Sequence, residues 1–583
     1  MSGSTSPSQG EEGGSIPPGR SNAMLFTNAQ VAQLLNEHSA ALEAAGEDFF
    51  KIRAYQQSAQ SIESLVDDVY EVWQEDKLLS IPGVGKSTAS HLEELFTKGK
   101  VAEFEKLKHQ VPQGMFALLQ VPGIGSKRAY SLAKELGVVS VRDLKKAINA
   151  NKVADLPGFG VTSQTNLKKA ISDWESLEKR LLLSDALSVA DEYLAYLRKS
   201  PAVLEGSVLG SARRRTPTVG DIDIAVATNN ADTVLDLFVK YPKVSKIINR
   251  GHLKSSVVLK SGFQVDLMTT PLKNWGSLLQ HFTGSKEHNI HLRKIAKDQG
   301  FKLSEKLAVS SEVGVYKKLK MQFIPPEMRE DSGEIQLALK GKISKLVELA
   351  EIKGDLQMHT QHSDGLNTVE EITAKASSLL YQYIAITDHA PSINTNSTAE
   401  VTAWVEKRKL EFEKVGKKYP KIKIINGVEV NIPASGGLAL PKEILSLFDF
   451  VIVSIHSGFR KSREEQTARI ISAISNSFVH VLGHPTGRVL LERPAIEADW
   501  DAVFKQAAKM GKLMEINAHP ERLDLSGNLI RRAKAVGVKF SLGTDAHMVD
   551  HLDNMKYGIY MARRGWLEAK DVVNTRDYKD LFK

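Results

Sequence analysis

The chain has 583 residues, of which 42% are hydrophobic and 25% charged, and its formal net charge at pH 7 is +8. This length exceeds what one hydrophobic core usually supports, so we expect several domains. The absence of cysteine excludes disulfides, thiolate catalysis and cysteine-based zinc sites. The modest positive charge favours a polyanionic partner.

The first 23 residues predict a disordered leader, because they are rich in Gly, Ser and Pro and hold little apolar content. The sequence shows no apolar run long enough to span a bilayer and no secretory leader. We therefore expect a cytoplasmic protein without a membrane partner, and we expect it to be a monomer.

From Leu25 to about Trp174, short helical stretches are separated by a repeated turn of the form hydrophobic-Pro-Gly-x-Gly, at residues 81–85, 121–125 and 156–160. Such a turn presents backbone N–H groups at a helix N-terminus, where a phosphate can approach closely. Basic residues follow the first two turns, which predicts contacts with DNA phosphates rather than with bases. The alternative for any single turn is a tight connection without a ligand, and we expect this for the third. The predicted DNA-binding residues are Gly83, Gly85, Lys86, Gly123, Gly125 and Lys127.

An α+β block begins at about Leu177, with predicted strands over Val203–Thr228 and Ser255–Thr270. Asp221 and Asp223 are two residues apart in a predicted strand, so both side chains leave the same face. Asp266 lies on another predicted strand. Neighbouring carboxylates repel one another unless cations neutralise them, and Mg²⁺ prefers such oxygen ligands. Two ions held this way can activate a hydroxyl and stabilise a leaving pyrophosphate.

The segment that leads into these carboxylates is Gly210-Ser211-Ala212-Arg213-Arg214-Arg215. Its glycine and serine offer a phosphate close backbone approach and a hydroxyl, and its three arginines supply positive charge. A surface Asp-x-Asp beside a solvated basic loop is the alternative. The complete series from Gly210 to Asp223 is much more specific than a lone Asp-x-Asp.

A polar boundary at Glu327–Gly333 and a predicted helix near Ile335–Ile352 lead into a second α/β block. Short apolar strands alternate there with helical stretches, which predicts parallel strands in an open sheet or a barrel. The predicted strands are Ile384–Thr387, Ile422–Ile425, Phe450–Ser454, Val479–Leu482, Leu513–Ile516 and Lys539–Leu542.

Most of the chain's 16 histidines lie in this second block, and many follow a predicted strand. In a β/α barrel the strand C-termini converge on one face, so ligands distant in sequence meet there. Imidazole suits Mn²⁺, Zn²⁺ or iron, and such ions can activate water for phosphoester cleavage. A lone histidine is more often a hydrogen-bonded structural residue. Arg488, Arg522 and residues 517–520 either hold a substrate phosphate or are solvated loop residues.

The segment Gly210–Asp223 resembles the palm signature of the family X DNA polymerases, the polymerase beta family, and the resemblance extends from Leu25 to about Asp331. It implies DNA-directed DNA polymerase activity with dNTPs on gapped or nicked duplexes, and Asp221, Asp223 and Asp266 as catalytic Mg²⁺ ligands. It also implies a nucleotide-binding site made of Arg180, Gly210, Ser211, Arg214, His281, Phe282, Gly284 and Asn289.

Two residues depart from the family pattern. His281 replaces the usual tyrosine beside the incoming sugar, which bears on sugar discrimination. His91 stands where the family's sugar-phosphate lyases place a Schiff-base lysine, although Lys51 and Tyr55 are retained. Because a Schiff base needs a primary amine, the sequence predicts weak or absent lyase activity.

The second block resembles the PHP (polymerase and histidinol phosphatase) domain from about Gly354 to Lys583. The resemblance implies a distorted seven-stranded barrel with three ions, Mn²⁺ or Zn²⁺, and 3′→5′ exonuclease activity on 3′ ends, with abasic-site or 3′-phosphate cleavage in some members. Gln357 stands where many members have another histidine, and an amide oxygen is a weaker ligand. The implied metal ligands are Gln357, His359, Asp364, His389, Glu429, His456, His484, Asp545 and His547.

The predicted fold is therefore multidomain: an all-α helix-hairpin-helix region, an α+β nucleotidyltransferase palm and thumb, and a C-terminal α/β barrel. The predicted parts are a leader (1–23), a lyase-like helix-hairpin-helix domain (24–105), fingers (106–176), palm (177–270), thumb (271–330), linker (331–353) and PHP domain (354–583).

Two other functions are open at this point. One is a small-molecule phosphatase of the histidinol-phosphate type with an unrelated transferase attached, against which the hairpin turns and the match up to Asn289 argue. The other is a DNA-binding module with an inactive palm, against which the three intact aspartates argue.

Overall fold

The computed structural model describes residues 26, 28–63, 65, 69–74, 76–119, 121, 123–178, 180–393 and 396–581. The predicted leader (1–23) and Pro122 of the second turn lie outside these residues. The chain forms two compact units, Met1–Glu175 and Ser176–Lys583. Among the described helices, none combines the length and apolar character that crossing a membrane requires.

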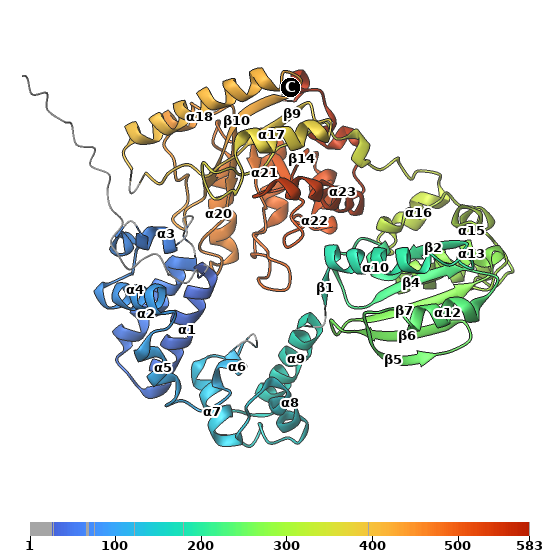
Figure 1. Ribbon diagram of the computed structural model, residues 1–583, viewed down its shortest axis with the longest axis horizontal. Helices are drawn as coiled ribbons and strands as arrows, with labels where there is room; N and C mark the ends of the chain where they lie inside the picture. The colour runs from blue at the N-terminus through green and yellow to red at the C-terminus, as the bar shows by residue number, and fades with distance from the viewer. Residues whose placement is uncertain are drawn as a thin grey trace, which may run out of the picture. The chain divides into compact units, whose positions relative to one another are not determined.

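The described regular elements of the first unit are all helical (Figure 1). They surround two hydrophobic cores, one around Trp73 and Phe96 and the other around Met115 and Leu132. The elements are α1 (Asn28–Ala45), α2 (Phe49–Glu63), α3 (Val69–Gln74), η1 (Leu78–Ser80), α4 (Lys86–Lys98), α5 (Ala102–Lys108), α6 (Met115–Leu119), α7 (Ser126–Leu136), α8 (Val141–Asn149) and α9 (Val161–Glu178).

The second unit begins with a central domain, defined here as residues 180–339, whose core is a five-stranded sheet in the order β2-β4-β7-β6-β5. Only the pair β4 and β7 is parallel. The strands are β2 (Glu205–Val208), β4 (Ile222–Ala227), β5 (Val244–Arg250), β6 (Lys254–Leu259) and β7 (Gln264–Thr270), and β1 (Leu181–Leu182) pairs with β3 (Thr218–Val219) in a separate ladder.

Helices cover both faces of this sheet (Figure 1). Alternate strand residues such as Ile224 and Leu267 share a core with α10 and α12, whereas Ala225 and Met268 pack with α13 on the opposite face. The helices are α10 (Leu183–Leu197), α11 (Gly210–Arg213), α12 (Ala231–Val239), η2 (Leu272–Asn274), α13 (Trp275–Thr283), α14 (Lys286–Asp298), α15 (Glu312–Lys318), η3 (Pro326–Met328) and α16 (Glu334–Leu339).

Three predicted elements of this unit are wrong in extent. The strand expected over Ser255–Thr270 is two antiparallel strands, β6 and β7, because the chain turns back at Gly262, which has a φ of 88°. The strand expected over Val203–Thr228 is interrupted by α11, which begins at Gly210 with a φ of 59°. The helix expected over Ile335–Ile352 ends at Leu339. Gly341 adopts a φ of 65°, and the N–H of Lys342 donates to the carbonyl of Leu337 at 2.9 Å, so a left-handed glycine closes the helix early.

The barrel domain, defined here as residues 354–581, contains seven strands in the order β14-β13-β12-β11-β10-β9-β8, and all their pairings are parallel. The first and last strands meet at a seam, where the N–H of Leu356 donates to the carbonyl of Leu542 at 3.2 Å and Met358 forms a bridge with Ala546. The predicted parallel barrel is therefore confirmed. The strands are β8 (Gly354–Asp355), β9 (Tyr383–Ile386), β10 (Lys423–Asn431), β11 (Phe450–Ser454), β12 (Val481–Leu482), β13 (Leu513–Asn517) and β14 (Phe540–Gly543).

Helices surround these strands, as Figure 1 shows. Several begin at a capping box, in which a Ser or Thr accepts from a backbone N–H and a Glu reaches back, so local sequence determines where they start. They are α17 (Val369–Ser378), α18 (Thr398–Lys418), α19 (Lys442–Leu445), α20 (Arg463–Ile474), α21 (Trp500–Met510), α22 (Gly527–Ala535) and α23 (Met555–Arg564), with short 3₁₀ turns η4 (Leu349–Glu351), η5 (Val549–Asn554), η6 (Ala569–Asp571), η7 (Val573–Thr575) and η8 (Tyr578–Asp580).

Candidate active sites

Three carboxylates gather near the N-terminal ends of β4 and β7, the two parallel strands of the central sheet. Asp223 in β4 and Asp266 in β7 are register partners on neighbouring parallel strands, on the face that α13 covers. Asp221 lies one residue before β4 rather than inside it. Burial, together with the charges of Asp221 and Asp266, raises the pKa of Asp223 to about 7. The negative charges of the three carboxylates therefore repel one another, and a bound cation would relieve this repulsion.

Lys254, to which no sequence pattern pointed, already supplies one positive charge at this site. Its Nζ lies 2.5 Å from Oδ2 of Asp266, and Nε2 of Gln264 donates to Oδ1 at 2.8 Å. Although burial opposes the shift, these two partners lower the pKa of Asp266. Three carboxylates and no nitrogen ligand form an oxygen donor set that fits Mg²⁺.

The loop before these carboxylates needs its glycine. A Cβ at Gly210 would lie 2.6 Å from Oδ2 of Asp223, so only glycine lets the two approach. Ser211 follows in α11. Arg180 donates from Nε to Oγ1 of Thr218 at 2.7 Å. It also lies beside Gly220, the residue that precedes Asp221 in the sequence. The predicted nucleotide-binding residues Arg180 and Gly210 thus both border the acidic group.

The structure brings the arginine-rich loop to the turn at residues 281–284. Nη1 of Arg214 donates to the carbonyl of Thr283 at 2.7 Å, and a Cβ at Gly284 would meet that same nitrogen at 3.0 Å. Arg213 forms a two-pronged ion pair with the buried Glu312, with bonds of 2.8 and 2.5 Å. Residues far away in the sequence, Thr283 and Glu312, therefore hold the loop in place.

Asn289 in α14 is bonded to the neighbouring helix α13. Its Nδ2 donates to the carbonyl of His281 at 2.6 Å, and its Oδ1 accepts from Nε2 of Gln280 at 2.8 Å. Both ends of the amide are thus engaged, and the second N–H and the second lone pair of the amide are the groups left for contact with an incoming base. Burial lowers the pKa of His281, and its ring meets that of Phe282 edge to face.

The barrel domain gathers its predicted ligands around Glu429. Nε2 of His456 and Nε2 of His484 lie 3.3 and 3.0 Å from Oε1 of Glu429 and 3.1 Å from each other. Nε2 of His359 lies 3.3 Å from Oε2 of Glu429 and 3.3 Å from Oδ1 of Asp545. One carboxylate therefore faces three imidazoles that come from different parts of the barrel.

Asp364 forms a second centre beside the first. Its oxygens lie 3.4 Å from Nδ1 of His359, 3.2 Å from Nε2 of His547 and 3.9 Å from Nε2 of His389. Nε2 of His389 also lies 3.9 Å from Oε2 of Glu429, so the two centres share ligands. The structure therefore brings all eight predicted His, Asp and Glu ligands of this domain into one cluster.

The cluster fits divalent cations. His359 is buried, and its ring nitrogens lie near carboxylates without aligned hydrogen bonds to them, while Nδ1 of the buried His484 has no hydrogen-bond partner among the described residues. Although burial opposes both shifts, the carboxylates raise the pKa of His359 well above its ordinary value, and the imidazoles lower that of Glu429 well below its own. Mixed nitrogen and oxygen donors of this kind suit Zn²⁺ or Mn²⁺.

Gln357 lies in the cluster but donates rather than accepts. Its Nε2 lies 2.9 Å from Oε2 of Glu429, while its buried Oε1 has no hydrogen-bond partner. Only the amide oxygen can bind a cation, so a bound ion would favour the opposite orientation of the amide. A ligand role for Gln357 thus requires the amide to turn.

Other groups support the ligands; of these, Glu515 was not indicated by any sequence pattern, whereas Arg522 and residues 517–520 were candidates for holding a phosphate. Oε2 of Glu515 accepts from the N–H of His484 at 2.5 Å, and Nδ2 of Asn517 donates to Oδ2 of Asp545 at 3.1 Å. Arg522 lies 3.2 Å from Asp545 and, with His519 and His547, lines a surface cavity. Arg488 instead donates to backbone carbonyls of residues 522 and 523, which makes it structural.

The three hairpin turns of the first unit share one backbone conformation. Their first glycines, Gly83, Gly123 and Gly158, have φ values of 82°, 86° and 81°. A helix begins directly after the second glycine of each turn, at Lys86, Ser126 and Val161. Lys86 is exposed, and the side chain of Lys127 is 83% exposed. The first two turns thus present exposed lysines beside helix N-termini, whereas the third presents Val161.

In the same unit, His91 is part of a polar chain. Nδ1 of His91 lies 2.9 Å from the hydroxyl of Tyr55, and its Nε2 lies 3.2 Å from Oε2 of Glu103. Lys51 lies 3.4 Å from the other oxygen of Glu103. The residues expected of a lyase site are therefore together, with imidazole in place of an amine.

Family models match several parts of the chain. They describe a helix-hairpin-helix domain at residues 26–101, a SAM-like helix-hairpin-helix tandem at 116–173, a DNA polymerase beta thumb at 278–330 and a PHP domain at 355–519.

Curated relatives agree with these matches. The chain is 33% identical over 563 residues to the DNA polymerase/3′-5′ exonuclease PolX of Bacillus subtilis (strain 168), an alignment that covers 94% of this chain and 98% of that protein. It is 30% identical over 232 residues to a probable phosphatase of Thermoanaerobacter sp. (strain X514), which covers 38% of this chain and 89% of that protein. A probable phosphatase of Photobacterium profundum is 28% identical over 212 residues, or 35% of this chain and 81% of that protein.

Proposed function

This chain belongs to the family X DNA polymerases that carry a PHP domain, and from this premise we propose that it fills short gaps in DNA and shortens 3′ ends. The observation that carries the proposal is the presence of two separate acidic centres, one of oxygen ligands in the central domain and one rich in histidine in the barrel domain. Each centre suits a different phosphoester reaction.

For gap filling, we assign Asp221, Asp223 and Asp266 to the catalytic centre. Mg²⁺ bound there would activate the primer 3′-hydroxyl and stabilise the pyrophosphate that leaves. Gly210 leaves room beside Asp223, and the arginines of the loop supply charge for the triphosphate of a dNTP. The assigned nucleotide-binding residues are Arg180, Gly210, Ser211, Arg214, His281, Phe282, Gly284 and Asn289.

For 3′-end cleavage, we assign the cluster around Glu429 and Asp364, including Gln357. Mn²⁺ or Zn²⁺ bound there, in up to three sites, would activate water against a phosphodiester. Arg522, at the edge of the cavity, is placed to hold the phosphate of the strand end. The same centre suits abasic-site and 3′-phosphate cleavage, because all three reactions break a phosphoester bond.

For DNA binding, we assign Gly83, Gly85, Lys86, Gly123, Gly125 and Lys127 to contacts with the phosphate backbone. Exposed lysines and free N–H groups at helix starts support this role, which needs no base contacts. We further propose that the protein is a cytoplasmic monomer and that its chain is divided into the seven parts predicted from the sequence.

The two reactions can be distinguished by primer length. The protein is incubated with a 5′-phosphorylated one-nucleotide gap and with a plain 3′ end, in Mg²⁺, Mn²⁺ and Zn²⁺ separately. A longer primer reports the central domain, and a shorter one reports the barrel. Incorporation in neither Mg²⁺ nor Mn²⁺ would favour a DNA-binding module, and faster turnover of histidinol phosphate than of a DNA end would favour a small-molecule phosphatase.

The residue at position 91 predicts weak lyase activity. His91 has no primary amine, and its two ring nitrogens face Tyr55 and Glu103. Borohydride is expected to trap little protein on an incised abasic site, and His91→Lys is expected to increase trapping. Efficient trapping of the wild-type chain would contradict the prediction.

A further inference from the structure

Helix α23 of the barrel domain contacts both the barrel and the central domain. On the barrel side, a Cβ at Gly558 would lie 2.9 Å from Cβ of Ala518 and 3.0 Å from Cδ2 of Leu542, so the helix packs tightly on β14 and the end of β13. Its C-terminal end contacts the loop at residues 213–215. The two domains meet here through a helix that packs on strands β13 and β14, next to the predicted ligand Asp545.

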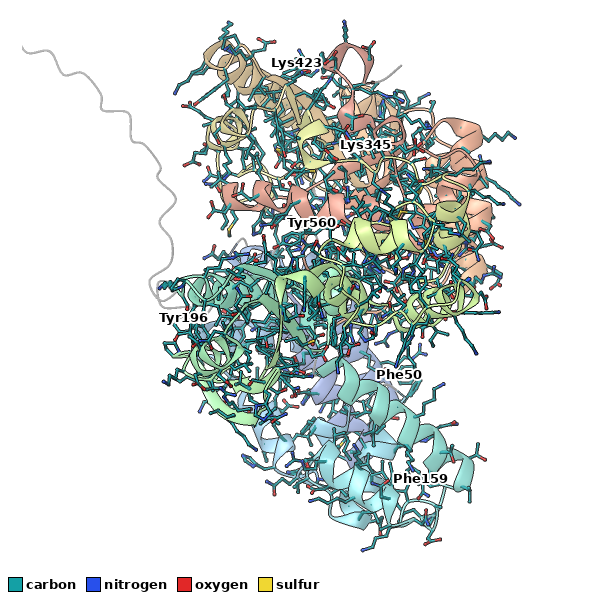
Figure 2. The ribbon with its side chains drawn as sticks, turned by 90° about the vertical axis from the view of Figure 1, so that its right-hand side faces the viewer. Phe50, Phe159, Tyr196, Lys345, Lys423 and Tyr560 are labelled. Carbon is teal, nitrogen blue, oxygen red and sulfur yellow. The ribbon has the colours of Figure 1, made fainter. Side chains whose placement is uncertain are left out.

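The contacts between α23 and this loop are specific. Nη1 of Arg564 donates to the backbone carbonyl of Arg214 at 2.6 Å. The guanidinium of Arg215 lies 4.4 Å from the ring centre of Tyr560, a distance typical of a cation–π contact. Tyr560, labelled in Figure 2, lies on the side of the barrel domain that faces the central domain.

Arg564 also shares a carboxylate with Arg214. Oε1 of Glu330 lies 3.2 Å from Nε of Arg214 and 3.0 Å from Nη1 of Arg564. Both guanidinium side chains are 15% exposed and Glu330 is 28% exposed, so the group is partly screened from water. Among the residues that the structure describes, these two arginines are the ion-pair partners of Glu330.

We propose that Arg564 and Tyr560 are positioning residues for nucleotide binding, so that the barrel domain completes the dNTP site of the central domain. This inference rests on the proposed function, in which Arg214 contacts the triphosphate. Arg564 holds the backbone at Arg214, Tyr560 holds the neighbouring Arg215, and Arg564 provides Glu330 with a second cation.

The second cation matters when nucleotide arrives. Arg214 must then exchange Glu330 for phosphate oxygens. With Arg564 present, Glu330 keeps a partner and the exchange leaves no unpaired charge. Without it, the carboxylate retains Arg214 or loses its only ion pair, and unpaired charges in partly buried sites are costly.

The test compares steady-state kinetics of full-length variants on a one-nucleotide gap. Arg564→Ala is expected to raise KM for the dNTP up to about fivefold with kcat changed less than about twofold, since the loss of a partly exposed ion pair falls on binding. Arg564→Lys is expected to restore part of the affinity. Glu330→Gln, which frees Arg214, is expected to lower KM and, when combined with Arg564→Ala, to cancel most of its effect.

The neighbouring residue on the same helix provides a matched control. Nε of Arg563 lies 2.7 Å from Oε1 of Glu327, an interdomain ion pair that does not involve the loop. Arg563→Ala is expected to leave KM unchanged. For Tyr560, replacement by Phe is expected to retain affinity and replacement by Leu to raise KM, because only the ring is used.

Several outcomes would overturn the inference. An unchanged KM in Arg564→Ala, an equal rise in Arg563→Ala, or a double variant as impaired as Arg564→Ala would each do so. If circular dichroism shows that Arg564→Ala does not fold, the variants Arg564→Lys and Glu330→Gln still test the inference. A wild-type chain that extends no primer would instead overturn the proposed function, and this inference with it.

Discussion

The acidic centre of the central domain and the cluster of the barrel domain differ in how their charges are balanced before a cation binds. In the central domain, Asp221, Asp223 and Asp266 face one another with Lys254 as a nearby cation, and the pKa of Asp223 rises to about 7. In the barrel, the three predicted carboxylate ligands Asp364, Glu429 and Asp545 each have imidazole neighbours. Although burial opposes the shift, these imidazoles lower the pKa of Asp364.

This difference bears on how each centre uses metal. The central carboxylates offer only oxygen ligands, and Mg²⁺ bound by such ligands usually keeps several waters, so it can arrive with a charged substrate. The barrel cluster adds imidazole ligands, which bind transition metals such as Zn²⁺ more tightly, so an ion can remain there between reactions. The first centre should therefore exchange its metal easily and the second should retain it.

The largest expected effect comes from substitutions that remove one centre at a time. Asp223→Ala is expected to reduce primer extension by at least about 10²–10³-fold, because charge stabilisation in the transition state is lost. It should leave Mn²⁺-dependent shortening of a plain 3′ end intact, and His359→Ala or Asp545→Ala should do the reverse. Primer length on sequencing gels measures both. Loss of both activities in one folded variant would show that the centres are not separate.

The next effect concerns metal retention. After extensive dialysis, elemental analysis should find Mn²⁺ or Zn²⁺ in the wild-type chain and much less in Glu429→Ala, because Glu429 contacts imidazoles from several strands. Retained metal also stabilises, by about 2.7 kcal/mol at a concentration 100-fold above Kd. Chelation should accordingly lower Tm of the wild type more than that of Glu429→Ala. Equal metal content in both proteins would contradict the difference between the centres.

A different effect, on folding stability rather than on activity, is expected where charges are balanced without a metal. Glu312 is paired with Arg213 and the buried Arg329, and although burial opposes it, these partners lower its pKa from 4.5 to about 2. Because the folded value is the lower one, the stability from this group is present above about pH 4.5 and is lost as pH falls toward 2. Glu312→Gln should destabilise by about 3–5 kcal/mol at pH 7, since it leaves the buried Arg329 and the partly buried Arg213 without their carboxylate. Thermal melts at pH 7 and pH 3.5 should show this penalty shrinking with acid; a constant penalty would argue against ion pairing.

The smallest effect is expected at Lys254. Its Nζ neutralises Asp266, but the side chain is half exposed, so the pair contributes about 1 kcal/mol or less. Lys254→Met should lower the Mg²⁺ concentration needed for half-maximal extension a few-fold, because the carboxylates then depend more on the ion. Lys254→Arg, which keeps the charge, should behave like the wild type. A higher Mg²⁺ requirement in Lys254→Met would assign the lysine to substrate rather than to Asp266.

Much of the architecture could be predicted from local patterns. The repeated Pro-Gly-x-Gly turns mark helix starts because left-handed glycines are needed there, and histidines after apolar strands indicated a barrel cluster. The predicted extent of the helix over Ile335–Ile352 was wrong, because Gly341 ends the helix after Leu339. Strand β5 was missed, since its residues are mostly exposed and lack an apolar pattern.

The support of the sites could not be predicted in the same way. Glu312 and Arg213, or Arg564 and Arg214, are brought together by tertiary packing across 99 and 350 residues. No spacing in the sequence encodes such pairs. The hydrogen bonds of Asn289, which engage both ends of its amide, are equally invisible to a motif. Motifs identify groups that perform chemistry, whereas packing decides which neighbours hold them.

The seam of the barrel has a consequence for how the chain folds. The segment that carries His359 is completed by hydrogen bonds with residues 542–546. The bond from the N–H of Thr544 to Asp355 at this seam joins residues 189 positions apart in the sequence. Contacts between such distant residues form slowly, because closing a long loop costs entropy before the contact is made. The predicted ligands on the two sides of the seam therefore come together only when the barrel closes.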